Sequence, residues 1–466
     1  MKNPHSRSLD ERADSDIAIV EKALQGMPTP SDVSALVANA KGNGKLQNTR
    51  FLPDFPAELL TLPHGMGDLQ AWILGYMTYP SPAAAGFTAL AALSHFAMPH
   101  LRINSREGLG FNEQYLLLAP TGFGKEDLRK PFGKLADKLT AMSPPAGGNL
   151  WLSGLARLQY SAPASQQGLH RLLEQHPAQT FLADEFAEWL GHAASDSHKQ
   201  QALGYIMQAY SKAFETMAVP AIGNKETPYV PVKHPRVLVF ATSTAERMLE
   251  TMTASQADSG AINRFVILTA EQERIAKRYN VTAEHYIPPA RVVELVAWMV
   301  QLRDDKAVIE FSAEARAFEQ DHDSMVLEPL RFDDRHLAGR LNEQALKMAA
   351  LIALSDRRTT VHRDDLAIAY GIREGLYHRA AALIGADGAL SGMHATGRAH
   401  SQLATAFANH PQLYRSALPK MSRAYRGLSE AERATVIRAL IEDGYCARHS
   451  THIGTLVSEV CKAKAA

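Results

Sequence analysis

The chain has 466 residues, more than one hydrophobic core usually serves, so its length predicts two or three domains. A hydrophobic content of 46% with 21% charged residues is typical of globular proteins and excludes wholesale disorder. Lys and Arg together number 49, as do Asp and Glu, so no global positive field draws the chain onto nucleic acid, and any such contact must be local.

The N-terminal region predicts a soluble, cytoplasmic protein. Residues 1–58 are largely polar, carry Gly and Pro signals, and are interpreted as a tail or a docking arm. The opening residues, MKNPHSRSLDERADSD, lack the apolar core of a secretory signal. The most apolar early stretch, Pro82–Met98, is rich in Ala and contains His95, so it predicts a buried helix and not a membrane span.

Residues 59–280 predict an α/β core. Two helices up to Met98 precede strands at Leu101–Ile103 and Tyr115–Leu118. From there to Leu268, strand-like runs alternate with helical stretches, and the runs read YLLLA, TFLAD, VLVFATS and FVIL. Such alternation indicates a mainly parallel sheet with helices on both faces.

A glycine-containing loop directly follows the second strand and directly precedes a helical pattern that begins at Lys125. This is the context of a phosphate-binding loop, in which glycines let backbone N–H groups curl round the phosphates. The helix N-terminus adds its positive end, and Lys125 reaches the outer phosphates. We therefore predict that a nucleotide is bound by Thr121, Gly122, Phe123, Gly124, Lys125 and Glu126. The alternative is a glycine turn before an ordinary helix, without a nucleotide.

Glu126 stands where such a loop normally has Ser or Thr, whose hydroxyl binds Mg²⁺. A carboxylate roughly 5 Å from a phosphate oxygen repels it by about 3 kcal/mol per charge pair at an effective dielectric near 20. This repulsion weakens nucleotide binding unless Mg²⁺ lies between the two anions and takes Glu126 as a ligand. The sequence leaves efficient Mg²⁺-dependent hydrolysis open.

Two acidic residues, Asp184 and Glu185, follow the apolar run TFLA. In a nucleotide site the first carboxylate holds Mg²⁺ through water, and the second activates the attacking water. An apolar strand that ends in Asp-Glu is also a common way to begin a solvated helix. Because this pair follows the loop within the same alternating pattern, we predict Asp184 as a metal ligand and Glu185 as a catalytic residue.

A further apolar strand, Val237–Ala241, ends in Thr242, Ser243 and Thr244. Polar groups at this strand end are placed to orient the water beside the terminal phosphate, so Thr242 and Ser243 are candidate catalytic sensors. An N-cap for the helix that begins at Ala245 is an alternative interpretation of the same residues, and the two interpretations are compatible.

Arg264 lies in the segment SGAINRF, directly before the strand-like run FVIL. An Arg on a loop at the sheet edge can reach the terminal phosphate in a neighbouring subunit and stabilise its charge. This role implies a homo-oligomer, such as a hexameric ring. The alternative is an ordinary surface salt-bridge partner.

The region after the core is predicted to be helical. Residues 281–390 carry patterns such as VVELVAWMVQL and LNEQALKMAALIAL and are interpreted as a helical lid. Residues 391–466 hold three short helical patterns, whose spacing fits a small winged-helix-like domain. The expected fold class is therefore α/β, with a P-loop NTPase core, leading helices, a lid and a small C-terminal domain.

The order of these motifs, YLLLAPTGFGK, FLADEFAEWL, VLVFATST, SGAINRF and LNEQALKMAALIAL, resembles a family of phage and mobile-element P-loop NTPases. That family is helicase-like, belongs to the RecA/AAA+ type and is often associated with primases, and the resemblance spans Leu59 to Ile384. It implies ATP and Mg²⁺ as cofactors. By resemblance, Lys125 binds phosphate, Asp184 the metal and Glu185 the water; Arg264 is the finger, and Arg340 is a second nucleotide sensor from the lid.

Two regions are candidates for nucleic-acid contact. Arg423 and Arg426 lie in a C-terminal segment where basic residues outnumber acidic ones, with Tyr414 and Tyr425 nearby as stacking groups. Lys225 lies on a turn signal, Gly-Asn-Lys, between two extended stretches. A solvated helical face and a plain surface hairpin are the respective alternatives.

The sequence thus predicts an oligomeric ATP-dependent DNA helicase or remodelling ATPase in the replication of a phage or mobile element. DNA and a primase or other replication protein are the expected partners. A different class stays open because of Glu126: a non-hydrolysing scaffold, loader or regulatory protein with a degenerate nucleotide site.

Overall fold

The computed structural model describes most of the chain from Leu52 onward. The described residues are 52–105, 108–142, 154–193, 196–219, 229–251, 260–270, 276–303, 307–333, 335–386, 399–400, 402–404, 406–407, 412–414, 418–426, 430–442, 449–450 and 456–459. The expected N-terminal arm up to residue 51 and the turn that carries Lys225 lie outside these residues.

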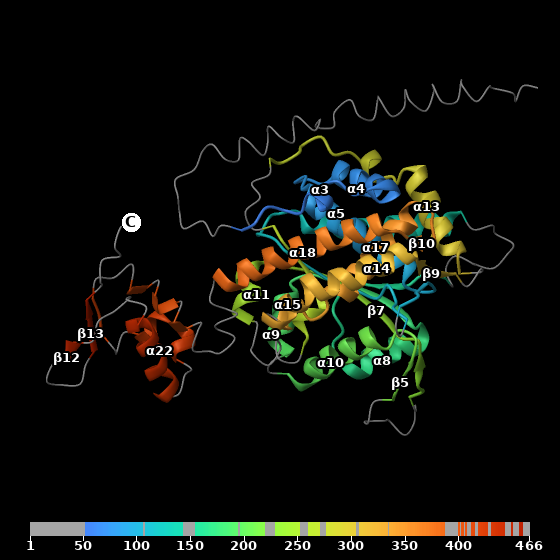
Figure 1. Cartoon of the computed structure of the whole chain (residues 1–466). Helices are drawn as coiled ribbons and strands as arrows, with labels where there is room; N and C mark the ends of the chain where they lie inside the picture. The colour runs from blue at the N-terminus through green and yellow to red at the C-terminus, as the bar shows by residue number, and fades with distance from the viewer. Residues whose placement is uncertain are drawn as a thin grey trace, which may run out of the picture. The chain divides into compact units, whose positions relative to one another are not determined.

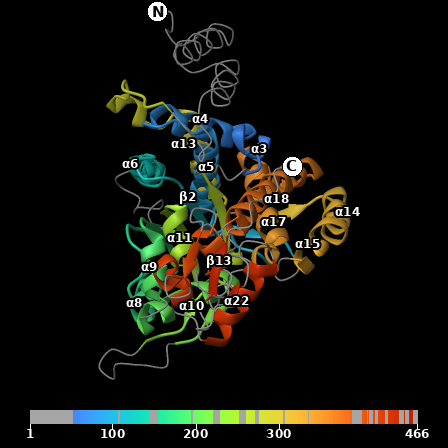
Figure 2. The same ribbon diagram turned by 90° about the vertical axis from the view of Figure 1, so that its left-hand side faces the viewer.

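A five-stranded, wholly parallel sheet in the order β3-β4-β7-β2-β8 forms the centre of the fold. Its strands are β2 Gln114–Leu118, β3 Arg157–Gln159, β4 Ala178–Ala183, β7 Arg236–Ser243 and β8 Phe265–Thr269. Figures 1 and 2 show helices on both faces of this sheet, which explains why every residue of β2 and β4 is buried. The mixed α/β class and the parallel sheet are confirmed, and they are consistent with a P-loop NTPase-like core.

The edge strand β3 has no counterpart among the strands that the sequence pattern indicates. It has three residues, none of which is fully buried, so neither its length nor its hydrophobicity marks it. The helices around the sheet are α6 Lys130–Ala141, α8 Gln166–Gln175, α9 Phe186–Ala193, α10 Ser197–Ser211 and α11 Ala245–Thr251. A separate two-stranded antiparallel sheet joins β5 Thr216–Met217 to β6 Val232–Lys233.

The leading helices are α3 Ala57–Leu60, α4 His64–Tyr76 and α5 Pro82–Ala97. Helix α5 begins as its sequence demands, because Pro82 supplies a preset φ at the first turn and the Ser81 hydroxyl accepts the N–H of Ala84. Every residue of α5 after Pro82 is buried, so the prediction of a buried helix is confirmed. Among the helices that the structure describes, none combines the length and the apolar character needed to cross a membrane.

The region expected to be an all-helical lid also contains strands. Strands β9 Val308–Phe311 and β10 Thr360–Val361 form a parallel three-stranded sheet with β1 Arg102–Ile103, so the expectation of a purely helical region was wrong. These strands have four and two residues, too few for a clear alternating pattern. The elements around them are η3 Ala283–Tyr286, α13 Ala290–Gln301, α14 Ala313–His322, η4 Asp323–Leu327, α15 Glu328–Asp333, α16 Arg335–Ala338, α17 Leu341–Ser355 and α18 Arg363–Ala386.

One buried hydrophobic cluster extends from Leu52 to Ile384 and includes both the sheet and the helices that follow it. Helix α18 packs against β8, and α17 packs against α18 and the leading helices. Figure 1 shows α17 and α18 running side by side along the sheet. Within the described residues the helices from α13 to α18 therefore share the hydrophobic core of the sheet.

The C-terminal residues form their own small hydrophobic core, which includes Leu403, Phe407, Leu418 and Leu440. Its helices include α20 Leu418–Met421, α21 Arg423–Arg426 and α22 Glu430–Glu442. Its strands, β11 Gln412–Tyr414, β12 His449–Ser450 and β13 Leu456–Glu459, form an antiparallel sheet in the order β11-β13-β12.

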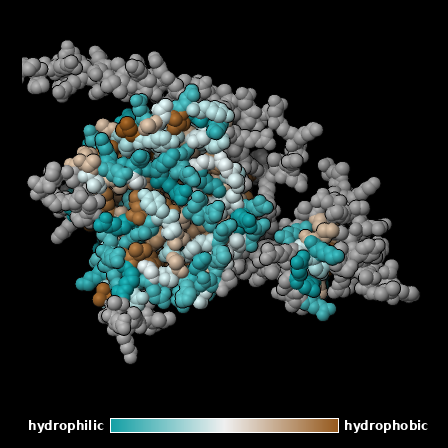
Figure 3. Space-filling model, turned by 180° about the vertical axis from the view of Figure 1, so that it is seen from behind, coloured by the Kyte–Doolittle hydropathy of each residue, from teal (hydrophilic) through white to brown (hydrophobic). Residues whose placement is uncertain are grey.

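Large hydrophobic side chains that reach the surface lie on separate elements. Examples are Tyr160 after β3, Tyr279 before η3, and Met325 in η4. On the face seen in Figure 3, hydrophobic side chains are scattered among hydrophilic ones. Isolated side chains of this kind are normal on folded proteins and mark no apolar docking surface.

Helix α5 is joined to the sheet by buried polar contacts. The Nδ1 atom of His95 lies 2.8 Å from the hydroxyl of Thr180 on β4, and the Ser94 hydroxyl lies 2.8 Å from that of Tyr115 on β2. Complete burial lowers the pKa of His95 to about 3, so the imidazole is neutral in the folded protein near neutral pH.

We expect acid to destabilise the fold in part through His95. An unfolded imidazole takes up a proton below about pH 6.5, whereas the buried one stays neutral down to about pH 3. The contribution of His95 is therefore fully present above pH 6.5 and falls by about 1.4 kcal/mol per pH unit as the pH drops through this window. Thermal unfolding of His95→Gln should depend less on acid than that of the native chain. Equal acid dependence in the variant and in the native chain would contradict the assignment.

Candidate functional site

The parallel register of β2, β7 and β4 brings three polar strand ends together. Leu118 of β2 pairs with Ser243 of β7, and Ala183 of β4 pairs with Ala241 of β7. The glycine loop therefore begins level with Ser243, and Asp184 lies opposite Thr242. Because the carboxyl ends of parallel strands share one edge of the sheet, this edge is where a ligand of such a fold usually binds.

Two glycines of the loop after β2 adopt left-handed backbone conformations. Gly122 and Gly124 have φ values of +82° and +81°, a region that L-residues rarely adopt. At Gly122 an added Cβ would meet nothing within 4 Å, so conformation and not space requires glycine there. Among the described residues, neither glycine donates its amide in a backbone–backbone hydrogen bond.

The sequence pattern predicts an α-helix that begins at Lys125, but the chain does not form an α-helix there. Residues Lys125–Arg129 form a 3-10 helix, η1, and α6 begins only at Lys130. Asp127, in the middle of η1, is buried; its Oδ2 accepts the Thr78 N–H at 2.9 Å, and its Oδ1 pairs with Lys130 Nζ at 2.6 Å. These contacts tie the tight turn to the loop after α4, a constraint that local sequence does not reveal.

Asp184 is the centre of the contacts at this edge. Its Oδ1 accepts the Thr242 hydroxyl at 2.6 Å and the N–H of Glu185 at 3.0 Å. Its Oδ2 lies 3.4 Å from Nη2 of Arg129, the last residue of η1. The Thr244 hydroxyl instead accepts the Arg247 N–H at 3.3 Å, so the strand end supplies both a contact to the acid and a helix cap. Sequence reasoning missed Arg129, for which no motif gave a signal.

Glu185 adopts a left-handed backbone conformation, with φ at +49°. Such a conformation is uncommon for a residue with a side chain and is found more often at functional sites. The carbonyl of Glu185 accepts the N–H of Glu188 at 2.9 Å, which starts α9. Both Asp184 and Glu185 are exposed to solvent at the strand end.

Asp184 and Glu126 do not fit the way in which a nucleotide site of this kind usually holds Mg²⁺. Both carboxylate oxygens of Asp184 already have protein partners, and Glu126 replaces the expected hydroxyl. Within the described part of the chain, no group of three or more His, Cys, Asp or Glu side chains is arranged to hold a metal ion. A cation can use Oδ2 of Asp184 only in competition with the guanidinium of Arg129.

Arg264 and Arg340 lie at the other end of the strands. Their guanidinium carbons are each 5.9 Å from the ring centre of Tyr210, whose hydroxyl donates to Glu113 Oε2 at 3.3 Å. Glu113 precedes the first residue of β2, whereas the loop follows its last residue, a separation of about 16 Å along five residues of strand. The structure therefore does not bring either arginine to the loop of its own chain.

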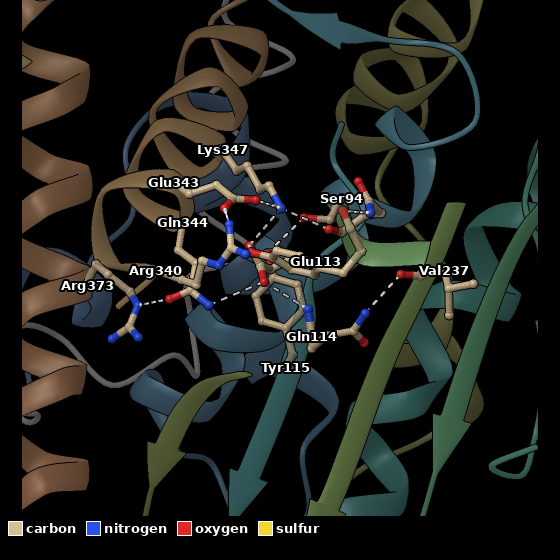
Figure 4. A network of polar contacts seen from close by, with 12 residues as sticks. Ser94, Glu113, Gln114, Tyr115, Val237, Arg340, Glu343, Gln344, Lys347 and Arg373 are labelled. Carbon is tan, nitrogen blue, oxygen red and sulfur yellow. Dashed lines mark hydrogen bonds and ion pairs between the residues drawn. The ribbon is translucent and has the colours of Figure 1, made fainter. Parts of the chain in front are cut away.

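Figure 4 shows the buried polar network around Glu113. Lys347 of α17 places Nζ 3.4 Å from Glu113 Oε2 and 3.3 Å from Glu343 Oε1. Burial raises the pKa of the Glu113 carboxyl against the opposing effect of Lys347. Burial acts in the same direction on Glu343, but Lys347 and Arg340 outweigh it and hold its pKa below the ordinary value. The sequence signal for this network is the single Lys within the otherwise apolar run of α17.

Two of the candidate nucleic-acid residues, Arg423 and Arg426, lie on α21. Arg426 is exposed, and its Nε donates to the Pro419 carbonyl at 2.9 Å, while Arg423 begins α21. Tyr425 is 2% exposed in the small C-terminal core, so the expectation that it stacks on bases was wrong. The physical reason is that Tyr425 is part of the same buried hydrophobic cluster as Leu440.

Comparison with known proteins gives little beyond the geometry. No family model matches the sequence, and no curated protein matches it. The crystal structure of a full-length MCM homologue from Methanopyrus kandleri is similar at a TM-score of 0.37 and 13% sequence identity. The similarity covers 76% of this chain and 62% of that chain. A likeness at this TM-score carries no argument about function.

We expect removal of only one partner of the buried ion pair between Lys347 and Glu113 to destabilise the fold strongly. Lys347→Met leaves the Glu113 carboxyl buried without its cation, and it should lower the free energy of unfolding by about 3–5 kcal/mol. The double variant Lys347→Met with Glu113→Gln removes both charges and should recover part of that loss in denaturant titrations. Lys212→Met, which breaks an exposed pair with Glu215, should cost less than about 1 kcal/mol. Equal losses in the two single lysine variants would contradict the role of burial.

Proposed function

We propose that this chain is a P-loop nucleoside triphosphatase whose site lies between the loop at Ala119–Glu126 and the acids Asp184 and Glu185. One observation carries the proposal. A glycine loop with two left-handed glycines, a pair of acids and two hydroxyl-bearing residues meet at the carboxyl edge of one parallel sheet. Each of these groups is suited to binding or hydrolysing a phosphate. Their position together at one end of the parallel strands is what supports a single nucleotide site.

The proposed reaction is hydrolysis of ATP. The loop amides and Lys125 hold the phosphates. The oxygen of a water molecule attacks the terminal phosphorus, Glu185 accepts the proton of that water, and the bond from phosphorus to the bridging oxygen breaks to give ADP and phosphate. Thr242, held to Asp184 at 2.6 Å, and Ser243 are the groups proposed to orient the water.

Arg264 is proposed to act on the site of a neighbouring subunit. It lies at the amino edge of the sheet, so the phosphates that it can reach belong to another copy of the chain. Burial lowers the pKa of its guanidinium, with a further effect of Arg340, but arginine keeps its charge at any physiological pH. The role requires a homo-oligomer, for which a ring is the natural closed form.

DNA is the proposed substrate for the motion that hydrolysis drives, as in a helicase or remodelling ATPase. The C-terminal residues support this view, because α22 precedes the antiparallel pair β12–β13 in the manner of a winged helix, with exposed Arg426 nearby. Replication of a phage or mobile element, with a primase as partner, is the setting that the motif order suggests.

Two variants separate binding from hydrolysis. Lys125→Ala removes the cation at the phosphates and should weaken ATP binding at least about tenfold. Glu185→Gln keeps the shape of the site but cannot accept the proton, so phosphate release should fall by about 100-fold or more while ATP affinity stays within about threefold. Release is measured with and without DNA, and Glu188→Gln, an exposed acid on the next turn, serves as the matched control.

The same measurements decide between the two function classes. If ATP binds but no phosphate is released under any DNA or metal condition, the chain is a non-hydrolysing scaffold, loader or regulator that retains the fold. If ATP does not bind, the nucleotide site itself is rejected.

Complementation tests the arginine across subunits. Arg264→Ala has an intact loop but lacks the arginine, and Lys125→Ala has an intact arginine but a damaged loop. Each variant alone should therefore be inactive. In an equal mixture, about one quarter of the sites combine a good loop with a good neighbouring arginine, and ATPase activity should return to about that fraction. A mixture that remains as inactive as its components would exclude action across subunits.

A further inference from the structure

Arg129 is the one guanidinium that η1 brings to the acidic strand end. It lies four positions after Lys125, and its Nη2 is 3.4 Å from Oδ2 of Asp184. The Arg129 side chain is 21% exposed, and that of Asp184 is 40% exposed. A cation from the first turn after the glycine loop therefore crosses to the acid where metal binding is expected.

The guanidinium of Arg129 has donors to spare. Its contact with Asp184 is long and uses one of its five N–H groups. Within the described residues it has no other hydrogen-bond or ion-pair partner. The next cation, Lys130, is by contrast fully engaged, since it pairs with Asp127 at 2.6 Å and lies over the ring of Tyr286. A planar fork with free donors suits a phosphate oxygen pair.

The charge of the site calls for such a cation. Lys125 and Arg129 are positive, and Glu126, Asp184 and Glu185 are negative, so the five side chains sum to a charge of −1. A triphosphate adds several negative charges, and Glu126 removes the hydroxyl that would help a metal to balance them. Without Arg129 the same set would carry −2.

We infer that Arg129 is a phosphate-binding residue, which supplies at this site the positive charge that a metal ion supplies in related loops. The inference rests on the proposed nucleotide site and deepens it. Its consequence is that ATP binds to this chain with little dependence on Mg²⁺, because the countercharge is covalently part of the helix that follows the loop.

The test is titration of the full chain with ATP by calorimetry, in a chelator and in Mg²⁺. The native chain should bind with affinities that differ by less than about threefold between the two conditions. Arg129→Gln should bind at least about tenfold more weakly in the chelator, or about 1.4 kcal/mol, and should regain much of the loss in Mg²⁺, because Asp184 is then free for the cation. Arg129→Lys keeps the positive charge but loses the planar guanidinium, so its ATP affinity in the chelator should lie between those of the native chain and Arg129→Gln.

Arg247→Gln is the matched control, because Arg247 is 63% exposed on α11 and pairs with Glu250 at 3.5 Å. It should bind as the native chain does. Native binding that requires Mg²⁺ would overturn the role of Arg129 and leave the nucleotide site intact, as would unchanged binding by Arg129→Gln in the chelator. Absence of ATP binding in both conditions would overturn the nucleotide site as well. If Arg129→Gln does not fold, the ATP affinity of Arg129→Lys in the chelator is measured instead. An affinity equal to that of the native chain would show that the planar guanidinium is not needed and would overturn this part of the inference.

Discussion

The in-register parallel pairing of β4, β7 and β2 is the constraint on which both the fold and the candidate site depend. It sets Asp184 opposite Thr242 and starts the glycine loop level with Ser243. A slip of one position would turn every side chain of a strand to the opposite face and would separate these groups. Both faces of the central strands are buried, so a slip would also disturb the close packing of their side chains against the flanking helices. The packing that stabilises the core therefore also aligns the polar groups of the site.

The opposite end of the same strands is held by charge. Glu113 and Lys347 are buried together, with the half-buried Glu343 beside them, and an unpaired charge in such a place is costly, so these contacts favour the observed position of α17 against the sheet. Arg340, at the start of α17, lies beside Tyr210, and so does Arg264, which comes directly before β8. The sheet thus carries the loop and the acids at one edge and the arginines at the other. In the proposed oligomer, the arginine edge of one subunit completes the loop edge of the next.

At Asp184 the site departs from what its motifs suggest. A hydroxyl of the adjacent strand and a guanidinium from η1 occupy the carboxylate, and the expected hydroxyl after Lys125 is replaced by Glu126. In the proposed nucleotide site these two departures oppose each other in charge, since Glu126 adds a negative charge next to the loop and Arg129 adds a positive one. The replacement of Ser or Thr by Glu126 is therefore compatible with the nucleotide binding proposed for this site.

The sequence by itself determined the α/β class, the buried helix at Pro82–Ala97, and the placement of the loop, the acids and the hydroxyls at strand ends. These follow from local patterns, namely apolar runs and the polar residues that end them. The tertiary structure alone decided the partners of Asp184, because Arg129 and Thr242 are 55 and 58 positions away along the chain. It also decided the short strands β3, β9 and β10, the 3-10 turn held by Asp127, and the edge on which Arg264 and Arg340 lie. Such features depend on pairing between distant segments, whose energies no local pattern records.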